Sequence, residues 1–442
     1  MTALDEAAYD RRRLRQWLAG RARADRVDRR DLLRLLAATG LATALPPALA
    51  TPALAAPAHA APGHAATSAR TAPRSTPSAA AAPGIVKPLP TDRFTIRGTN
   101  AETNFAALAD TGHSTPASHF FVRNHTSTPL IDAATWELRI WGDGLAGGRE
   151  RTFTLADLRR LPAVTRSAFV ECAGNGRSFY SSQQGQSVEG TAWTLGAIGS
   201  ARWRGARLAD VLRLAGIRRD AVDVLPRGLD PEYVTADGTD LGRVRRPLPV
   251  PKALDDVLLA YEMNGEPLPP DHGAPVRLVV PSWVGIASTK WVGDIEVSRE
   301  PLFSPWNTIF YRLFGAAYPP EGSAPLTRQT LKSAFELPWN ANLPARTHHR
   351  LTGRSWSATG TIARVDVSTD AGRTWHRARL HDTPHRADWV RWSVPWHPTT
   401  KGATELLARA TDTTGRTQPT TTLHNTQGYL FDAVVRHPVT VV

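Results

Sequence analysis

The chain has 442 residues, of which 41% are hydrophobic, and it carries a formal net charge of +13 at pH 7. A chain of this length buries substantial cores, and at roughly 100–200 residues per domain we expect about two domains. The basic residues are scattered, and no zinc-finger spacing or aromatic ribonucleoprotein motif accompanies them, which argues against nucleic-acid binding. A positive field also attracts small anions, so an anionic substrate or an acidic protein partner is the better interpretation.

The first 60 residues have the order of a twin-arginine export signal. Arg29 and Arg30 precede an apolar run from Leu35 to Leu49, and Ala-x-Ala stretches follow. The run has about 15 residues, fewer than the roughly 20 that cross a bilayer, and prolines interrupt it. We therefore expect a cleaved signal over residues 1–60 and a periplasmic, cell-wall or extracellular location. An ordinary amphipathic N-terminal helix is the alternative.

Three further segments follow the signal. Residues 61–90 are dominated by Ala, Pro, Ser and Thr, a composition typical of a disordered linker. Residues 91–325 mix β-rich runs such as Pro275–Val280 with brief helical stretches such as Arg207–Ala215, which is an α+β pattern. No GxGxxG or GxxxxGK[ST] sequence opens a helix there, so nicotinamide and ATP sites are not supported. In residues 326–442 short alternating strands and turns repeat, as in an immunoglobulin-like β-sandwich.

Cys172 is the only cysteine, so the chain forms no internal disulfide and has no CxxCH haem attachment site. It lies in the segment Phe169–Arg177, after a short apolar run and before a glycine-rich loop. A lone cysteine is ordinarily a small buried hydrophobic residue. Here the glycines allow a bulky group to approach the backbone, and Arg177 favours the thiolate that a transition metal binds. The segment is therefore a candidate metal site.

The segment Glu171–Arg177, with the sequence ECAGNGR, resembles the cysteine loop of the sulfite oxidase family of molybdopterin oxidoreductases. Phe121–His125 resembles the upstream cofactor and substrate loop of that family, and Tyr261–Arg277 resembles its longest signature. The match continues in the same order with Lys290–Gly293, Trp306–Tyr311 and Val365–Trp375. The resemblance implies a molybdopterin-binding domain over residues 91–325 and an immunoglobulin-like dimerisation domain over residues 326–442, as in a bacterial exported sulfite dehydrogenase.

The resemblance also implies a role for each matched residue. Cys172 binds molybdenum, and Tyr311 and Arg123 act in catalysis close to it. Planar guanidinium groups suit sulfite and sulfate, and the substrate-binding residues are Arg123, Arg177, Trp193 and Tyr311. The anionic molybdopterin cofactor, Mo-molybdopterin, is held by Phe121, Arg123, His125, Asp230, His272, Arg277, Ser288, Thr289 and Lys290.

Several of these residues also have an ordinary structural interpretation. His272 lies in Asp-His-Gly, a sequence typical of a turn, and Arg277 lies in a strand pattern, where solvent-facing cations are common. Tyr311 and Trp193 are aromatic side chains that would equally well fill a domain junction. Gln427 stands where some family members have a further pocket arginine, which predicts a less positive pocket and a weaker affinity for sulfite.

The activity that the resemblance implies is oxidation of sulfite to sulfate by oxygen-atom transfer. The chain has no haem or flavin motif, so electrons are expected to pass to an external acceptor such as a c-type cytochrome, and a homodimer is expected by analogy. Two alternatives stay open: a reductase or dehydrogenase acting on another S-oxide or thio compound, and a metal-free exported binding protein. A hydrolase built on Cys172 and His125 lacks any local signature of such enzymes.

Overall fold

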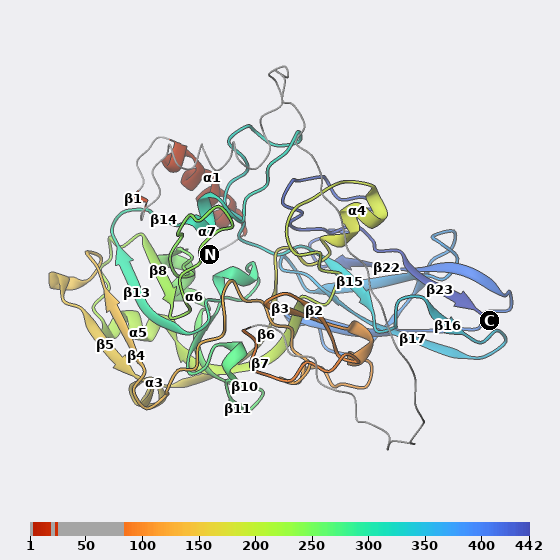
Figure 1. Ribbon diagram of the computed structural model, residues 1–442, viewed down its shortest axis with the longest axis horizontal. Helices are drawn as coiled ribbons and strands as arrows, with labels where there is room; N and C mark the ends of the chain where they lie inside the picture. Colours follow the sequence, from red (N-terminus) through yellow and green to blue (C-terminus); the bar gives the residue numbers. More distant parts are fainter. Residues whose placement is uncertain (1–2, 19–22, 25–83) are drawn as a thin grey trace, which may run out of the picture. The chain divides into compact units, whose positions relative to one another are not determined.

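The computed structural model describes residues 3–18, 23–24 and 84–442. The twin-arginine pair, the apolar run after it and most of the predicted linker lie outside these residues. The described chain forms an α+β domain followed by an all-β domain, which confirms the predicted fold class (Figure 1). Among the helices of the described ranges, none combines the length and the apolar character that a membrane span requires.

Two five-stranded sheets form the centre of the first domain. One has the order β11-β10-β7-β6, with β12 also paired to β10, and the other has the order β5-β4-β13-β8-β9. The first is built from β6 (Ala163–Glu171), β7 (Ile198–Arg207), β10 (Leu258–Met263), β11 (Glu266–Pro267) and β12 (Arg277–Val279). The second is built from β4 (Glu137–Trp141), β5 (Arg151–Thr154), β8 (Asp223–Gly228), β9 (Leu248–Pro249) and β13 (Val292–Ser298). Because β6 ends at Glu171, its pairing with β7 determines where Cys172 emerges.

Short elements cover these sheets. The helices are α3 (Leu155–Arg160), α4 (Ser178–Gln184), α5 (Leu208–Leu214), α6 (Val250–Asp255) and α7 (Pro305–Thr308), and a hairpin joins β2 (Phe94–Arg97) to β3 (Asn100–Thr103). In α5, Leu208, Val211 and Leu212 lie on one face and are fully buried against the sheets. Burial of each such side chain contributes about 1.5–3 kcal/mol, so this apolar core anchors the loops that lead to the pocket.

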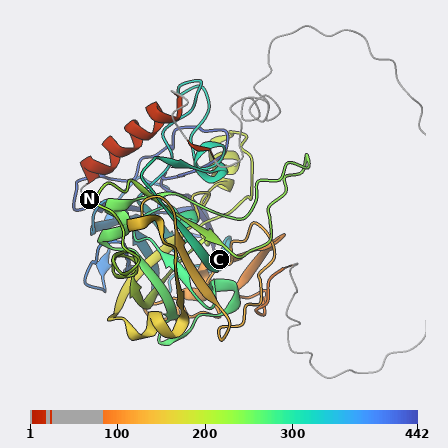
Figure 2. The same ribbon diagram turned by 90° about the vertical axis from the view of Figure 1, so that its left-hand side faces the viewer.

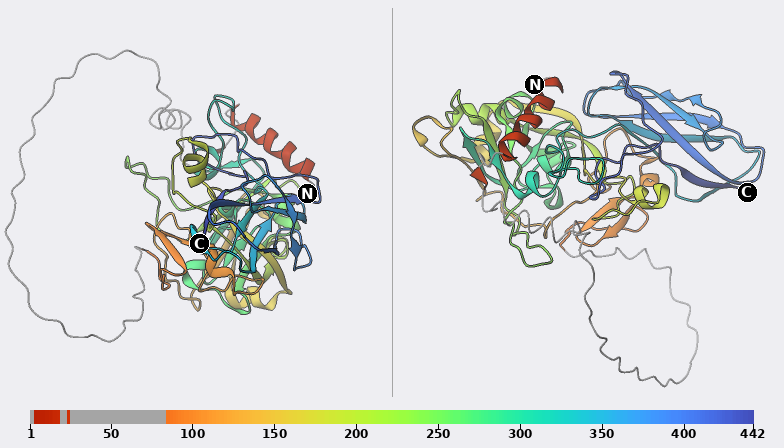
Figure 3. Two further views of the ribbon diagram at one scale, coloured as in Figure 1. Left: turned by 90° about the vertical axis from the view of Figure 1, so that its right-hand side faces the viewer. Right: turned by 90° about the horizontal axis from the view of Figure 1, so that it is seen from above.

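The second domain is a two-layer sandwich, and its strands run alongside one another in Figure 3. One layer contains β15 (Lys332–Phe335), β17 (His349–Trp356), β20 (Arg379–Leu380) and β21 (Trp389–Trp396). The other contains β16 (Ala341–Leu343), β18 (Ile362–Ser368), β19 (His376–Arg377), β22 (Gly402–Asp412) and β23 (His437–Val441). Val365, Val367 and Trp392 are fully buried between the layers, as the alternating pattern predicts.

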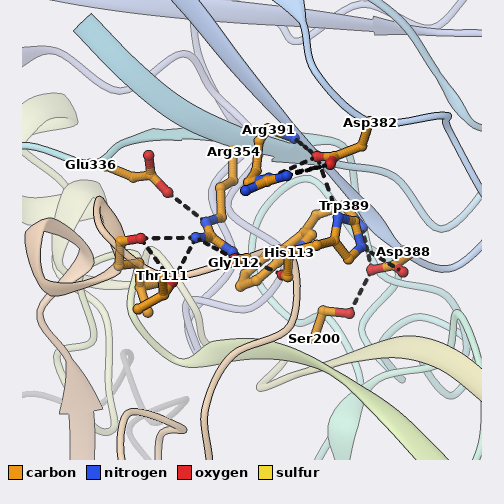
Figure 4. Close-up of polar contacts among 11 residues, drawn as sticks. Thr111, Gly112, His113, Ser200, Glu336, Arg354, Asp382, Asp388, Trp389 and Arg391 are labelled. Atoms are coloured by element: carbon orange, nitrogen blue, oxygen red, sulfur yellow. Dashed lines mark hydrogen bonds and ion pairs between the residues drawn. The ribbon is translucent and has the colours of Figure 1, made fainter. Parts of the chain in front are cut away.

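A buried polar network joins the two domains (Figure 4). Arg354 of β17 is fully buried, pairs with Glu336 at 2.6 Å and donates a hydrogen bond to the backbone oxygen of His113 at 3.0 Å. Asp388 of the second domain accepts a hydrogen bond from Ser200 at 2.5 Å and lies 2.9 Å from Nε2 of His113. An apolar cluster that contains side chains of both domains, including Phe169 and Trp356, completes the contact.

The folded part of the first domain begins before residue 91, the predicted start. Residues 84–90 fall in the predicted linker 61–90, yet Leu89 is buried beside Phe94. The backbone N–H of Lys87 also donates to Oδ2 of Asp271 at 2.7 Å. The composition of the linker changes only gradually toward Leu89 and does not mark where the first domain begins. That start depends on a contact with Asp271, a residue far away in the sequence.

The predicted export signal, residues 1–60, also contains structure that precedes the twin-arginine pair. Residues Ala3–Leu18 form helix α1, drawn in red in Figure 2. Arg23–Ala24 form β1, which pairs in parallel with β14 (Leu302–Phe303) of the first domain. Helix α1 therefore belongs to the same compact unit as the two domains.

Candidate active site

The first domain has a pocket beside Cys172, where loops that follow several strands converge. The empty space between its side chains is about 720 Å³, including the part that is open to solvent. The predicted residues that line it are Phe121, Arg123, His125, Cys172, Asp230, His272, Arg277, Ser288, Thr289, Lys290 and Tyr311. They come from widely separated segments, so the fold brings together the residues that the sequence indicated. Their individual roles stay predictions.

Cys172 lies directly after β6 and is 8% exposed. Its backbone N–H donates to the oxygen of Ala197 at 2.9 Å, and its own backbone oxygen accepts from Asn175 at 3.0 Å, which turns the chain sharply. A Cβ at Gly285 would lie 2.6 Å from the backbone oxygen of Glu171, so only glycine lets the facing loop approach this closely. Among the described residues no cluster of three or more His, Cys, Asp or Glu side chains is placed to hold a metal, so Cys172 stands by itself as a candidate protein ligand.

A buried ion pair from the second domain holds the cysteine loop. The ammonium group of Lys332 lies 2.7 Å from Oε1 of Glu171, and the two side chains are 2% and 0% exposed. Asn175 donates to the same oxygen at 2.9 Å, and the indole of Trp356 donates to Oε2 at 3.0 Å. Lys332 also donates to the backbone oxygen of Asn175 at 2.9 Å. The residue next to Cys172 is therefore fixed by both domains.

Positive side chains also line the pocket. Burial lowers the pKa of Arg277 to about 9, and burial together with repulsion from Arg277 lowers the pKa of Lys290 well below its usual value. Burial also lowers the pKa of His272 and of His125 well below 6.5, so both imidazoles are neutral at pH 7. A bound anion would reverse these shifts, because it stabilises the charged forms.

Two buried polar atoms of the pocket have no hydrogen-bond partner within the described part of the chain, Oδ1 of Asp230 and Oγ1 of Thr289. Burial raises the pKa of Asp230 to about 6. A ligand that carries an anionic group and also its own donors and acceptors would satisfy these atoms and pair with the cations. A pterin phosphate such as molybdopterin has this chemistry, so the residues present fit the expected cofactor.

Tyr311 borders the pocket in a strained backbone conformation. Its φ of 57° lies in the left-handed region, which non-glycine residues seldom adopt and which is common at functional sites. The ring stacks on Tyr429 with centroids 5.3 Å apart, and the backbone oxygen accepts from Leu326 at 2.8 Å. Burial raises the pKa of Tyr311 well above 10, although nearby Arg123 opposes the shift. The hydroxyl therefore keeps its proton at neutral pH and is available as a donor.

Two predicted substrate residues do not line the pocket as described. The guanidinium of Arg177 instead donates to the backbone oxygen of Gln427 in the second domain at 2.8 Å and to that of Thr191 in the first domain at 2.9 Å. It also lies over the ring of Tyr429 at 5.1 Å, because Gly428 leaves room for its side chain. Trp193 is fully buried behind the rings that form the wall. Both residues belong to the layer that supports the pocket.

Gln427 lies close to the loop that carries Tyr311. Its side-chain nitrogen donates to the backbone oxygen of Ile309 at 3.3 Å. Its Oε1 is buried without a hydrogen-bond partner among the residues that the structure describes. The side chain therefore approaches the active-site loop from the second domain, where the sequence comparison with the family expected a pocket cation in some members.

Sequence reasoning missed several residues of this site. Lys87 was assigned to the linker, yet its ammonium group lies 3.4 Å from Nε2 of His272, and burial lowers its pKa to about 7. Asp271 accepts hydrogen bonds from the backbone of Val86 and Lys87 and from the hydroxyl of Thr128, so it holds residues 84–90 beside the pocket. Asp271 belongs to the signature Tyr261–Arg277, whereas nothing local marked Lys87.

Comparison with known proteins gives concordant findings. The family model "Oxidoreductase molybdopterin binding domain" matches residues 125–306, and "Mo-co oxidoreductase dimerisation domain" matches residues 331–441. Mitochondrial sulfite oxidase of Rattus norvegicus is 36% identical over 361 residues, which are 78% of this chain and 64% of the rat protein. Sulfite oxidase of Arabidopsis thaliana is 31% identical over 349 residues, which are 72% of this chain and 86% of that protein.

A solved structure is similar over most of its length as well. The sulfane dehydrogenase SoxCD from Paracoccus pantotrophus has a TM-score of 0.65 and 28% sequence identity, and the match covers 76% of this chain and 83% of that chain. The chain thus spans somewhat less than two thirds of the rat relative but most of the plant and bacterial ones.

Proposed function

Because the chain belongs to the sulfite oxidase family of molybdopterin oxidoreductases, we propose that its pocket binds the molybdenum cofactor and oxidises sulfite to sulfate. The observation that carries this proposal is the pocket itself. It combines the only cysteine of the chain with buried, mutually repelling cations and with buried polar atoms that lack partners. That donor set suits an anionic, thiolate-bound metal cofactor.

The residues of the pocket divide the work between cofactor and substrate. Lys290 and Arg277 would bind the cofactor's phosphate, and Asp230 would accept a hydrogen bond from its ring. Sγ of Cys172 would bind the metal. When bound, the cofactor supplies two-electron oxygen-atom transfer, a chemistry that amino-acid side chains lack.

Arg123 and Tyr311 would bind the substrate oxyanion. The guanidinium of Arg123 pairs with negative oxygens, and the protonated hydroxyl of Tyr311 donates a hydrogen bond to another oxygen. Since burial keeps the pKa of Tyr311 high, the hydroxyl does not lose its proton when an anion enters. Together the two side chains would hold the oxyanion beside the metal that Cys172 would bind.

Molybdenum analysis combined with steady-state turnover tests this proposal. We expect about one molybdenum per chain in protein matured with its cofactor, and reduction of ferricytochrome c that depends on sulfite. Protein that folds but contains no molybdenum would refute cofactor binding and would support a metal-free binding protein. Molybdenum-loaded protein that does not turn over sulfite would refute the substrate.

Oxidation of sulfane sulfur is a second candidate. It is favoured by the similarity to the solved sulfane dehydrogenase and by Gln427, which places an amide where some relatives have a cation. Parallel assays with sulfite and with a protein-bound persulfide separate the two candidates, since the higher kcat/KM identifies the substrate.

We further propose that the protein is exported by the twin-arginine route as a homodimer that passes electrons to an external acceptor. The supporting observations are the order of Arg29 and Arg30 before the apolar run and the match of residues 331–441 to a dimerisation domain. Replacing Arg29 and Arg30 by lysines should leave the protein in the cytoplasm, and sedimentation of the exported form should give twice the mass of the chain that remains after signal cleavage. Export of the lysine variant, or a monomer at micromolar concentration, would refute the respective claim.

A further inference from the structure

A second surface of the folded chain, outside the pocket, binds helix α1. The side chains of α1 that contact it are spaced along one face of the helix, Glu6, Tyr9, Asp10 and Arg13. Glu6 and Arg13 are 3% and 4% exposed, whereas the neighbouring Arg11 and Arg12 are exposed to solvent. The helix therefore contacts this surface with one face and exposes the other to solvent.

Asp223, the first residue of β8, is the centre of this surface. Its Oδ1 accepts a hydrogen bond from the hydroxyl of Tyr9 at 3.1 Å and forms an ion pair with Arg13. Its Oδ2 accepts from the backbone N–H of Leu302 at 2.8 Å. Asp223 is fully buried, and a buried carboxylate that loses its cation is strongly destabilised. The surface is thus built to receive the charges that α1 carries.

Further contacts fix the register of the helix. Glu6 forms an ion pair with Arg328 and accepts a hydrogen bond from the indole of Trp283 at 3.4 Å. Asp10 accepts from the hydroxyl of Thr327 at 3.1 Å. Trp283 and Asp223 belong to the first domain, whereas Thr327 and Arg328 lie at the start of residues 326–442, so these partners form a surface only after the chain has folded.

The same surface is connected to the active-site loop. Arg246 is fully buried, and burial lowers its pKa to about 10, while the nearby carboxylates of Asp10 in α1 and of Asp223 oppose this shift. Arg246 donates to the backbone oxygen of Leu326 at 2.7 Å, and the N–H of Leu326 donates to the oxygen of Tyr311 at 2.8 Å. Docking of α1 therefore depends on residues that also hold the loop of Tyr311.

We propose that helix α1, residues 3–18, is a detachable docking segment that recognises this folded surface through Glu6, Tyr9 and Arg13. An isolated helix of this length is only marginally stable in water, so α1 is expected to form fully when it is docked. The twin-arginine pair follows shortly after Ala24, so docking would connect the predicted signal to a domain that has already folded. This last consequence rests on the proposed export, whereas the docking is independent of the substrate.

Cleavage of the full chain after folding tests the docking. A site for a sequence-specific protease is inserted between residues 60 and 80 of the full-length protein, and the cut protein is passed over a size-exclusion column. We expect the N-terminal fragment to elute with the body. Arg13→Ala should lower the retained fraction by about 10-fold or more, because it removes the cation that pairs with Asp223. Arg12→Ala is the matched control: it removes one positive charge at the neighbouring, exposed position and should leave the retained fraction unchanged.

Hydrogen exchange on the uncut protein gives a second readout that is independent of the inserted site. The amides of residues 3–18 should exchange about 10-fold faster or more in Arg13→Ala than in Arg12→Ala. Asp223→Asn should release the helix from the other side of the contact while molybdenum content is retained. Elution of the wild-type fragment apart from the body, or equal effects of Arg12→Ala and Arg13→Ala, would overturn the proposal.

Discussion

Replacing Lys332 by Met should loosen the loop that carries Cys172. The ammonium group of Lys332 forms the buried ion pair with Glu171 and bonds the backbone of Asn175, so it holds the cysteine loop from the second domain. Methionine has a similar length but no charge. The buried side chain of Glu171 would then keep its hydrogen bonds from Asn175 and Trp356 but would lose its cation.

The expected magnitude follows from that burial. Removing one partner of a buried ion pair typically costs about 3–5 kcal/mol. If this cost lowers the free energy of local loop opening by about 3 kcal/mol, the population of the open loop rises about 100-fold, since 1.4 kcal/mol is a factor of ten. Cys172 is the only thiol and is 8% exposed, so the rate of its alkylation reports this opening directly.

The assay compares alkylation rates in folded, cofactor-free protein. Lys401→Met is the matched control, because it removes a lysine from the same domain at an exposed position. The double variant Glu171→Gln/Lys332→Met should be labelled more slowly than Lys332→Met, because no charge is left unpaired. Labelling of Lys332→Met within twofold of the wild-type rate, or a double variant as reactive as the single one, would refute the reasoning.

Three further predictions concern the metal, the substrate and the domain contact. Cys172→Ser should keep the fold and the bound pterin but lose nearly all sulfite turnover, because an alcohol is a poor substitute for a soft thiolate ligand, and unchanged kcat would contradict the metal role. Gln427→Arg should lower the KM for sulfite several-fold by adding a cation beside the Tyr311 loop, and an unchanged KM would place Gln427 outside the substrate's reach. The hydrogen bond to Asp388 raises the pKa of His113. Protonated His113 therefore stabilises the fold fully below about pH 6.5, and this stabilisation is lost as the pH rises through the raised pKa of the folded protein. Because this side chain is partly exposed, His113→Gln should remove no more than about 1 kcal/mol of that pH-dependent stability. Urea unfolding at pH 5.5 and pH 9 measures it, and the same change in the free energy of unfolding between the two pH values in both proteins would contradict the role of His113.

The site was predictable to the extent that its residues lie within short motifs. Cys172 was marked by its glycine-rich loop and His272 by the signature around it, and the structure places both beside the same pocket. Arg177 shared the motif of Cys172 but is directed toward Gln427 of the second domain. A motif indicates which residues are near one another along the chain, whereas the direction of a side chain depends on what packs against it.

The sequence by itself determined the order and class of the two domains, and it indicated Cys172 as the candidate metal ligand. The sequence signals behind these predictions are local. Side-chain direction repeats every two residues in a strand, so alternation marks runs such as Trp389–Val394, and turn residues and motifs can likewise be read from short segments. Only the tertiary structure decided that Lys332 holds the cysteine loop and that Arg13 of α1 binds Asp223. Each of these ion pairs joins residues more than a hundred positions apart, and burial of both partners, which gives the pairs their strength, exists only once the chain has folded.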